Sequence, residues 1–341
     1  MCSNADSAYA TGRSAASASP FRNCPAQPEH VPGRADQTAE KSGETAAHSL
    51  CGLVTRSMGG FYNVRTAAGT YACKPRGIFR KEKTILLVGD RVRIEPLPDG
   101  AGVITELMAR KNCFARPPIS NLDKLFIVLS TTKPEPDLFF ADKLTVVCAA
   151  SGVEPVVVVN KSDLRAPDSV AAAYEKAGYA VVAASAKTGM GLEEILRLAR
   201  GAVSAFAGFS GAGKSSLLSR LLPERLETGA VSEKLGRGRH TTRHTELFSV
   251  APDSYIADTA GFSSLDMLRN LSLKKEELQN AFPEFKPYLG QCRFVGCSHT
   301  KEKGCAVLEA VRHGEIQKSR HQSYLRLYEE LKPLKEWEQK K

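Results

Sequence analysis

The sequence has no uninterrupted run of about 18 apolar residues, the length that a membrane-spanning helix needs, so we expect no association with a membrane. No continuous apolar stretch follows Met1, which disfavours a secretory signal. Acidic residues interrupt the basic pattern of the first 48 residues, which disfavours a transit peptide.

The cysteines lack the even spread of a disulfide framework. Three of the nine lie between residues 292 and 305, beside a histidine. Such a grouping indicates metal binding in a reducing compartment rather than disulfide formation, so we expect a cytoplasmic protein.

Aromatic residues are scarce in residues 1–48, where Tyr9 and Phe21 stand among many Ala, Ser, Gly and Pro residues. Such a segment cannot bury enough apolar surface to offset the entropy cost of ordering, so we predict a disordered, low-complexity tail. A reading frame that starts too early is the alternative interpretation.

The rest of the chain has an ordinary globular composition. It has 341 residues, 42% of them hydrophobic and 25% charged, which indicates two to three domains with sizeable cores. Lys and Arg number 47 against 37 Asp and Glu, a net charge of +10. This excess favours a polyanionic partner, although a basic protein without such a partner would show it too.

Residues 49–117 show short β-type runs separated by turn residues, which predict a small barrel, an OB-fold. The runs that we read as strands are 60–64, 70–73, 85–88, 91–94 and 102–105. Residues 50–117 carry 12 Lys and Arg against 5 Asp and Glu, interleaved with Phe61, Tyr62, Tyr71 and Phe79. This mixture favours RNA binding, in which the basic side chains follow the RNA backbone and the aromatic side chains stack on bases. The alternative is that the aromatic rings fill the core of the barrel.

Residues 118–272 alternate between apolar strands and amphipathic helices, which predicts a parallel sheet covered on both faces. The expected strands are 124–129, 156–159, 179–183 and 202–207, followed by an apolar run at 255–257. The expected helices are 140–149, 169–177, 192–198 and 215–222.

A glycine-rich loop follows the strand 202–207 and opens a helix, the context that a phosphate-binding loop requires. It comprises Gly208, Phe209, Ser210, Gly211, Ala212, Gly213, Lys214, Ser215 and Ser216. Backbone N–H groups would surround the phosphates, Lys214 would reach the β- and γ-phosphates, and Ser215 would coordinate Mg²⁺. By itself this motif also fits an ATPase or a kinase.

The tetrapeptide Asn160-Lys161-Ser162-Asp163 removes that ambiguity in favour of GTP and GDP. The carboxylate of Asp163 can accept hydrogen bonds from N1–H and the exocyclic amine of guanine, whereas adenine offers neither donor in that arrangement. Asn160 should hold the loop, and Lys161 should flank the base. A surface turn is the alternative for the tetrapeptide alone.

Two further segments complete the expected nucleotide site. Ser185, Ala186 and Lys187 fit the loop whose backbone touches guanine O6, although alone they are a weak signal. Asp258 and Gly261 fit the Mg²⁺-side aspartate and the γ-phosphate-sensing glycine.

A basic, glycine-rich stretch before Asp258 is placed like a switch loop. Thr241 or Thr242 could supply a second hydroxyl to Mg²⁺, and a surface loop with incidental threonines is the alternative. Phe262 stands where many GTPases have a glutamine that orients the attacking water. We therefore take His240 as the candidate catalytic group.

These motifs occur in an inverted order, because the base-recognition segments precede the phosphate loop. All of them still follow strands of one parallel sheet, whose carboxyl ends meet at a single edge. The pattern therefore predicts a circularly permuted GTPase domain.

Residues 273–341 combine a cysteine and histidine cluster with helical stretches. Cys292, Cys297, His299 and Cys305 supply three thiolates and one imidazole within 14 residues, a set that suits one structural Zn²⁺ per chain. The alternative is that the cysteines are small buried residues. We read Glu302 and His313 as solvated, and the apolar stripe of the last helix as packed on its own domain.

Together, the motif order, the stretch from Gly238 to Thr242, the preceding barrel and the zinc cluster resemble the small ribosomal subunit biogenesis GTPase family, RsgA, over about residues 50–341. The resemblance implies slow GTP hydrolysis stimulated by the small (30S) ribosomal subunit, and a role in late maturation of that subunit. It also implies a catalytic role for the histidine at position 240. Ala260 stands where the family commonly has proline.

The sequence thus predicts a GTP hydrolase that docks on ribosomal RNA, with no sign of an obligate dimer, so a monomer is expected. The first competing function is a non-enzymatic RNA-binding module that only senses GTP, which the missing glutamine favours. The second is an ATP-using kinase or transport ATPase.

Overall fold

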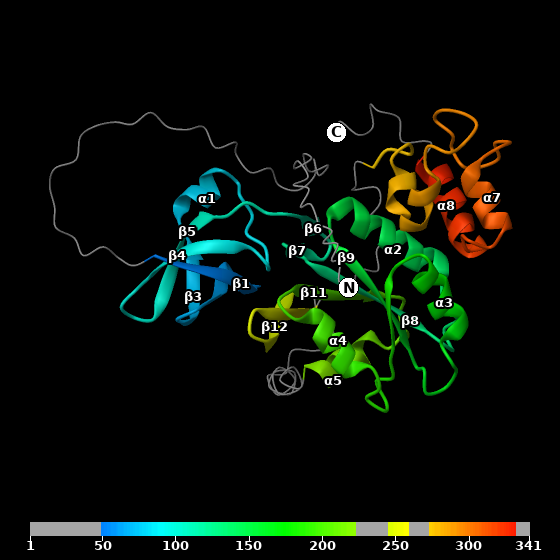
Figure 1. Ribbon diagram of the computed structural model, residues 1–341. Coiled ribbons are helices and arrows are strands. Elements are labelled where there is room, and N and C mark those ends of the chain that lie inside the picture. Colours follow the sequence, from blue (N-terminus) through cyan, green and yellow to red (C-terminus); the bar gives the residue numbers. More distant parts are fainter. Residues whose placement is uncertain (1–48, 223–244, 259–272, 332–341) are drawn as a thin grey trace, which may run out of the picture.

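The computed structural model describes residues 49–222, 245–258 and 273–331 (Figure 1). The predicted tail 1–48 lies outside these ranges, as do the switch-loop candidates His240, Thr241, Thr242 and Gly261. Within the described ranges, no helix has both the length and the apolar character that crossing a membrane requires.

The first domain is a closed five-stranded barrel with OB-fold topology, as predicted. Its strands pair in the order β1-β2-β3-β5-β4, and β4 pairs back onto β1. The buried residues Val54, Val64 and Ile104 fill its interior. Its elements are β1 (Leu50–Met58), β2 (Phe61–Thr66), β3 (Gly69–Pro75), α1 (Gly77–Lys81), β4 (Arg91–Pro96) and β5 (Ala101–Leu107).

Two features of the barrel differ from the sequence prediction. Strand β1 was not predicted, and the predicted strand at 85–88 is wrong, because only Val88 forms an isolated bridge there, to Ile119. The Asp90 carboxylate accepts the Leu87 N–H at 2.7 Å and thereby turns the chain away from a regular ladder. Gly89 completes the turn with a φ of 91°, and a side chain there would collide with the Ser120 carbonyl.

A short hairpin connects the barrel to the second domain, and it consists of β6 (Cys113–Ala115) and β7 (Pro118–Ser120). Buried polar contacts fix this junction. The Asp90 carboxylate accepts hydrogen bonds from the Arg110 guanidinium and the Ser120 hydroxyl, both at 2.6 Å. The two sheets also meet directly, because Arg56 of β1 pairs with Glu246 of β12.

The second domain is a six-stranded sheet in the order β10-β9-β8-β11-β13-β12. Five of these strands are parallel, as predicted, whereas β12 was not predicted and runs antiparallel to β13. The strands are β8 (Lys124–Ser130), β9 (Glu154–Asn160), β10 (Ala180–Ala183), β11 (Val203–Gly208), β12 (Glu246–Ala251) and β13 (Ser254–Asp258). The helices are α2 (Leu138–Ser151), α3 (Asp168–Lys176), α4 (Leu192–Ala199) and α5 (Lys214–Leu221).

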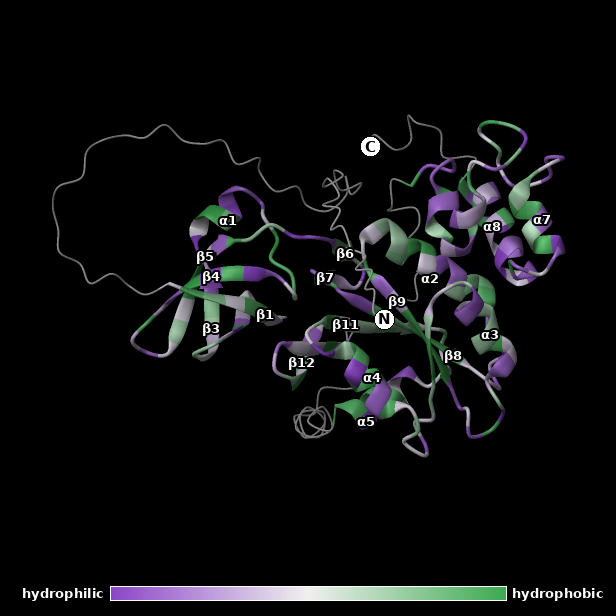
Figure 2. Cartoon of the chain, in the orientation of Figure 1, coloured by the Kyte–Doolittle hydropathy of each residue, from purple (hydrophilic) through white to green (hydrophobic). Residues whose placement is uncertain are grey.

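Alternating residues of the central strands face two separate cores. In β8, Leu125 and Ile127 belong to the core that includes α2 and α3, whereas Phe126 and Val128 belong to the core that includes α4 and α5. A strand that is buried on both faces reads as a continuous apolar run, and Figure 2 shows β8 and β11 mostly in the hydrophobic colour.

The third domain packs against α2 on one face of this sheet (Figure 1). It comprises η2 (Leu278–Ala281), η3 (Pro283–Tyr288), α7 (Ala306–Arg312) and α8 (Lys318–Leu331). The α8 stripe buries Tyr324, Leu327 and Leu331, and this core is continuous with that of α2. The stripe therefore serves two domains rather than its own domain alone.

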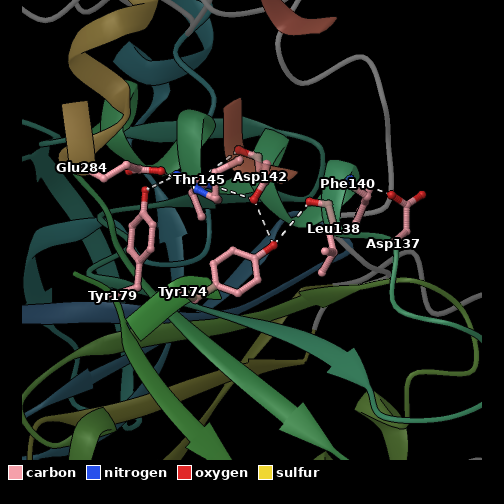
Figure 3. A network of polar contacts seen from close by, with 9 residues as sticks. Asp137, Leu138, Phe140, Asp142, Thr145, Tyr174, Tyr179 and Glu284 are labelled. Atoms are coloured by element: carbon pink, nitrogen blue, oxygen red, sulfur yellow. Dashed lines mark hydrogen bonds and ion pairs between the residues drawn. The ribbon is translucent and has the colours of Figure 1, made fainter. Parts of the chain in front are cut away.

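A buried ionic network joins α8 to the second domain (Figure 3). The Arg320 guanidinium donates to Asp142 of α2 at 2.6 Å and to Glu284 of η3 at 2.7 Å, and its side chain is 1% exposed. Tyr174 of α3 donates to the same Asp142 carboxylate at 2.9 Å. Charges buried this deeply need their partners, so the network holds the third domain against α2.

Candidate functional site

The motif residues lie at one edge of the second-domain sheet. Asn160, Gly208 and Asp258 end the parallel strands β9, β11 and β13, and Ser185 follows shortly after β10. Because the carboxyl ends of parallel strands meet at the same edge, segments that are distant in sequence form one rim.

Asn160 connects three of these loops directly. Its side-chain Nδ2 donates to the Ala212 carbonyl oxygen at 2.9 Å, and its Oδ1 accepts the Ala186 N–H at 3.2 Å. The residue is 1% exposed, so no water competes for these bonds. The base-recognition segments and the phosphate loop therefore face a common site rather than pointing apart.

The rest of the tetrapeptide is held by backbone contacts. The Ser162 hydroxyl donates to the Val159 carbonyl at 2.8 Å, and the Ser162 N–H donates to the Ala184 carbonyl at 3.0 Å. Asp163 is exposed, so its carboxylate is accessible to a ligand. In the next loop Ser185 is fully buried and its hydroxyl accepts the Thr188 N–H at 3.2 Å, whereas Lys187 is exposed.

The loop after β8 also supports the tetrapeptide, and sequence reasoning missed it. The Thr131 hydroxyl donates to the Lys161 carbonyl at 2.7 Å, and the Lys161 ammonium donates to the Lys133 carbonyl at 2.5 Å. Lys161 has a φ of 64°, a strained conformation that such contacts can maintain. No motif marks this loop, so only its position next to β9 could have indicated it.

The phosphate loop depends on glycine at two points. A side chain at Gly208 would collide with the Val128 carbonyl, and one at Gly213 would collide with the Asn160 amide. Ser210 and Gly211 are exposed, Phe209 packs edge-on against Phe140 of α2, and Ser215 and Ser216 are exposed on the first turn of α5.

Lys214 lies folded over this loop. Its ammonium donates to the Gly208 carbonyl at 2.6 Å and to the Phe209 carbonyl at 2.8 Å. Burial lowers the pKa of Lys214, because partial desolvation disfavours the charged ammonium. A half-buried cation at a helix N-terminus forms an anion-binding site.

Asp258 lies beside the phosphate loop, since β13 pairs with β11. On its other side it faces Glu246 of β12. Burial raises the pKa of the Glu246 carboxyl, Arg56 opposes that rise, and the charge of Asp258 adds to it. Gly261 and the switch-loop candidates lie outside the described residues.

The four predicted metal ligands form a cluster in the third domain. One donor atom from each of Cys292, Cys297, His299 and Cys305 lies within 4.8 Å of the others. The Sγ atoms of Cys292 and Cys305 are 3.8 Å apart, and Nδ1 of His299 lies 3.6 Å and 3.3 Å from them. Donors at the vertices of a tetrahedral zinc–sulfur site lie about 3.8 Å apart, so this set fits a metal ion.

Neighbouring groups hold these ligands in place. Nε2 of His299 lies 2.7 Å from the Gln279 amide oxygen, which fixes the ring so that Nδ1 faces the sulfurs. Burial lowers the pKa of His299, which favours the neutral imidazole that binds metals. Sequence reasoning missed Gln279, because this contact joins η2 to a loop 20 residues further along the chain.

Glu302 is not simply solvated, contrary to the sequence prediction. Its carboxylate accepts the backbone N–H groups of Ser298, Thr300 and Lys301 at 2.9–3.0 Å and thereby braces the loop that carries His299. Burial opposes ionisation of this carboxyl, but the hydrogen bonds prevail and lower its pKa to about 2. His313 is exposed, as expected.

The barrel aromatics divide between core and surface. Phe79 is buried, and Tyr62 and Tyr71 pack partly against the barrel core. Phe61 is 48% exposed, and the Lys74 ammonium lies 4.7 Å from its ring centroid. An exposed ring beside a cation suits base stacking and phosphate contact, so Phe61 is the aromatic residue that best fits nucleic-acid binding.

Comparison with protein families gives two adjacent matches. The RsgA N-terminal domain matches residues 51–104, and the RsgA GTPase domain matches residues 107–268. The small ribosomal subunit biogenesis GTPase RsgA of Moorella thermoacetica is 42% identical over 277 residues, which cover 80% of this chain and 94% of that one. The protein of the same name from Caldanaerobacter subterraneus subsp. tengcongensis is 43% identical over 285 residues, 82% of this chain and 95% of that one.

Solved structures agree with these sequence matches. YjeQ from Thermotoga maritima is 34% identical with a TM-score of 0.70, covering 83% of this chain and 99% of that one. YloQ, a circularly permuted GTPase, is 31% identical with a TM-score of 0.71, covering 86% and 99%. On these matches and on its own motif order, this chain is a GTPase of the RsgA family.

Proposed function

We propose that this protein hydrolyses GTP to GDP and phosphate while bound to the small (30S) ribosomal subunit, and that it acts in late maturation of that subunit. The observation that carries the enzymatic part is the bridge from Asn160 to the Ala212 carbonyl and the Ala186 N–H, which is what one guanine-nucleotide pocket requires. The names of the relatives support the ribosomal part.

In this proposal the base and the phosphates have separate binding groups. Asp163 accepts hydrogen bonds from guanine, Asn160 and Lys161 shape the pocket, and the backbone of Ser185–Lys187 approaches O6. The loop from Gly208 to Ser216 surrounds the phosphates. Lys214 exchanges its two carbonyl partners for phosphate oxygens, which offset its desolvation.

Separate groups are proposed to bind the cation and to orient the attacking water. Ser215, Asp258 and Thr241 or Thr242 hold Mg²⁺, which neutralises phosphate charge when bound. Gly261 contacts the γ-phosphate, and His240 orients the attacking water in place of the glutamine that Phe262 replaces.

We also propose that the third domain holds one structural Zn²⁺ through Cys292, Cys297, His299 and Cys305. Three thiolates and one imidazole at tetrahedral spacing favour zinc over a hard cation. Four protein ligands leave no open position, so this metal stabilises the domain and takes no part in hydrolysis.

The remaining assignments follow from the ribosomal role. The barrel contacts ribosomal RNA through its basic surface and Phe61, and the protein acts as a cytoplasmic monomer. The chain then divides into a tail (1–48), an RNA-binding barrel (49–117), a GTPase domain (118–272) and a zinc domain (273–341).

The test is GTP turnover measured with and without purified small ribosomal subunits. We expect slow turnover alone and marked stimulation by small subunits, but none by large subunits, which serve as the control. A near-zero rate in both conditions, together with tight GTP binding, would instead establish a GTP-sensing RNA-binding module.

The salt dependence of binding to small subunits tests the RNA contact. Because Lys and Arg displace counter-ions from phosphates, affinity should fall steeply as salt rises. An affinity that does not change with salt concentration would indicate that the docking site is a protein surface.

A further inference from the structure

Three charged side chains form a row across the junction between the barrel and the GTPase sheet. Arg56 of β1 is paired with Glu246 of β12, and Glu246 is paired with Asp258 of β13. Residues directly opposite one another on neighbouring antiparallel strands point to the same face, with Cβ atoms about 5 Å apart. The row therefore runs from the RNA-binding domain to the proposed magnesium aspartate.

The row contains one positive side chain, Arg56, and two negative ones, Glu246 and Asp258. The Arg56 guanidinium lies 3.7 Å from the Glu246 carboxylate, and both side chains are partly exposed, at 42% and 33%. Glu246 thus has a cation on one side and the Asp258 carboxylate on the other. Its negative charge adds to the field at Asp258, and Arg56 partly cancels that contribution.

The junction that carries the row is firmly packed. Leu53 of β1 lies near Arg56 along its strand, Leu247 of β12 adjoins Glu246, and both leucines belong to the same buried core. The buried Asp90–Arg110 pair fixes the other side of the junction. A packed junction holds the three charges at fixed separations, so the barrel can influence Asp258 through charge without any domain rotation.

We propose that Glu246 is a positioning residue for GTP hydrolysis that acts through Asp258, and that Arg56 tunes it from the barrel. This inference rests on the proposed function, in which Asp258 helps to hold Mg²⁺. The Glu246 charge strengthens the hold on the divalent cation, and Arg56 weakens it. An RNA phosphate that attracts Arg56 leaves Glu246 uncompensated and tightens Mg²⁺ binding, which couples RNA docking to turnover.

The test measures the Mg²⁺ concentration that half-saturates the complex with a non-hydrolysable GTP analogue, by calorimetry, and compares it with the concentration that gives half-maximal GTP turnover, at constant ionic strength, in three variants of the full chain. Glu246→Gln should raise this concentration by up to about tenfold, the effect of removing one unit charge at about 6 Å from a divalent cation in water. Arg56→Gln should lower it, by about twofold because the guanidinium is farther away. The double variant should return close to the wild-type value.

Arg93→Gln is the matched control. Arg93 also lies in the barrel and contacts a cross-strand glutamate, Glu106, at 3.0 Å, but it is on β4, which pairs with β1 and β5. It should leave the Mg²⁺ requirement unchanged.

Opposite shifts of the required Mg²⁺ concentration in the two single variants support the proposed coupling along the row, since structural damage would shift this concentration in the same direction in both. Equal shifts, or an unchanged Mg²⁺ requirement in variants of a wild-type protein that hydrolyses GTP, would overturn the inference and leave the proposed function intact. Absence of turnover in the wild type would instead defeat the proposed function itself. If Glu246→Gln does not fold, the Arg56→Gln shift alone decides, because Arg56 is partly exposed.

Discussion

The Asn160 side-chain amide and the Ala212 carbonyl oxygen lie 2.9 Å apart, although 52 residues separate them in the chain. This bond joins the end of β9 to the middle of the phosphate loop. It also occupies the space that a side chain at Gly213 would need, so the loop conformation and the asparagine require each other.

Replacing Asn160 with alanine should therefore weaken GTP binding and stability together. The change leaves the Ala212 carbonyl and the Ala186 N–H without a partner in a buried site, which costs about 1–3 kcal/mol for each group. We expect GTP affinity to fall at least tenfold, as measured by calorimetry.

Asn112→Ala is the matched control for that variant. Asn112 is also buried, and it bonds both backbone groups of Leu122, at 2.8 Å and 2.9 Å, far from the phosphate loop. It should lower the melting temperature without changing the GTP affinity of the folded protein. Equal losses of affinity in both variants would contradict a specific role for Asn160.

Asp163→Asn should change the base preference. The carboxamide cannot accept hydrogen bonds from both guanine donors, but it can donate one to the additional oxygen of xanthine. The affinity for GTP should therefore fall, and xanthosine triphosphate should bind. Competition against a labelled nucleotide measures this change. Asp168→Asn, in the first turn of α3, is the control and should retain the preference for GTP.

Loss of Gln279 should loosen the metal without removing a ligand. Gln279→Ala frees Nε2 of His299, and loss of such a supporting contact typically costs about 10- to 100-fold in metal affinity. Titration with a coloured chelator would measure the change, and metal content would be unchanged before chelator is added.

Cys297→Ala should release the metal outright, since it removes one of the four donors. Cys148→Ala, at a buried cysteine of α2 outside the cluster, should keep one zinc ion per chain. Full zinc content in the Cys297 variant would refute the ligand assignment.

Arg320→Met should destabilise the protein in a pH-dependent manner. It leaves buried carboxylates unpaired, at a cost of about 3–5 kcal/mol. Burial already raises the pKa of Asp142, against the opposing effect of Arg320. In the variant that pKa rises further above its unfolded value of about 3.9, so stability present at low pH is lost as the pH rises.

The stability deficit of Arg320→Met should therefore be smallest below about pH 4 and grow toward neutrality. Denaturant titrations across this range would measure it. Arg197→Met removes an exposed, solvent-screened pair with Glu194 and should leave the stability nearly unchanged at every pH. A deficit in the Arg320 variant that does not change with pH would contradict the buried-charge account.

The sequence predicted most of the GTPase domain because its signals are local. Apolar strands and glycine positions such as Gly208 and Gly213 follow from the immediate chain, and so does the Cys and His cluster at 292–305. The elements it missed depend on pairing with distant segments. Strand β12 is half-exposed and forms by pairing with β13. The segment 85–88 does not form a regular β-ladder, because the Asp90 carboxylate accepts the Leu87 N–H.

The supporting contacts were the least accessible to prediction. Thr131, Gln279 and Arg320 belong to no motif, and each acquires its role only when another element is brought against it. The buried arginine in particular looks like an ordinary surface residue in the sequence of α8, since its four charged and hydroxyl partners come from α2, η3 and the residue before β10.

The central position of β11 has a consequence for how the chain is made. This strand lies between β8 and β13, yet β8, β9 and β10 all leave the translating ribosome before it. Until β11 emerges, β8 exposes an unpaired apolar edge, and Asn160 has no partner in the phosphate loop. The nascent protein thus completes its base-binding half first and depends on later synthesis to protect it from aggregation.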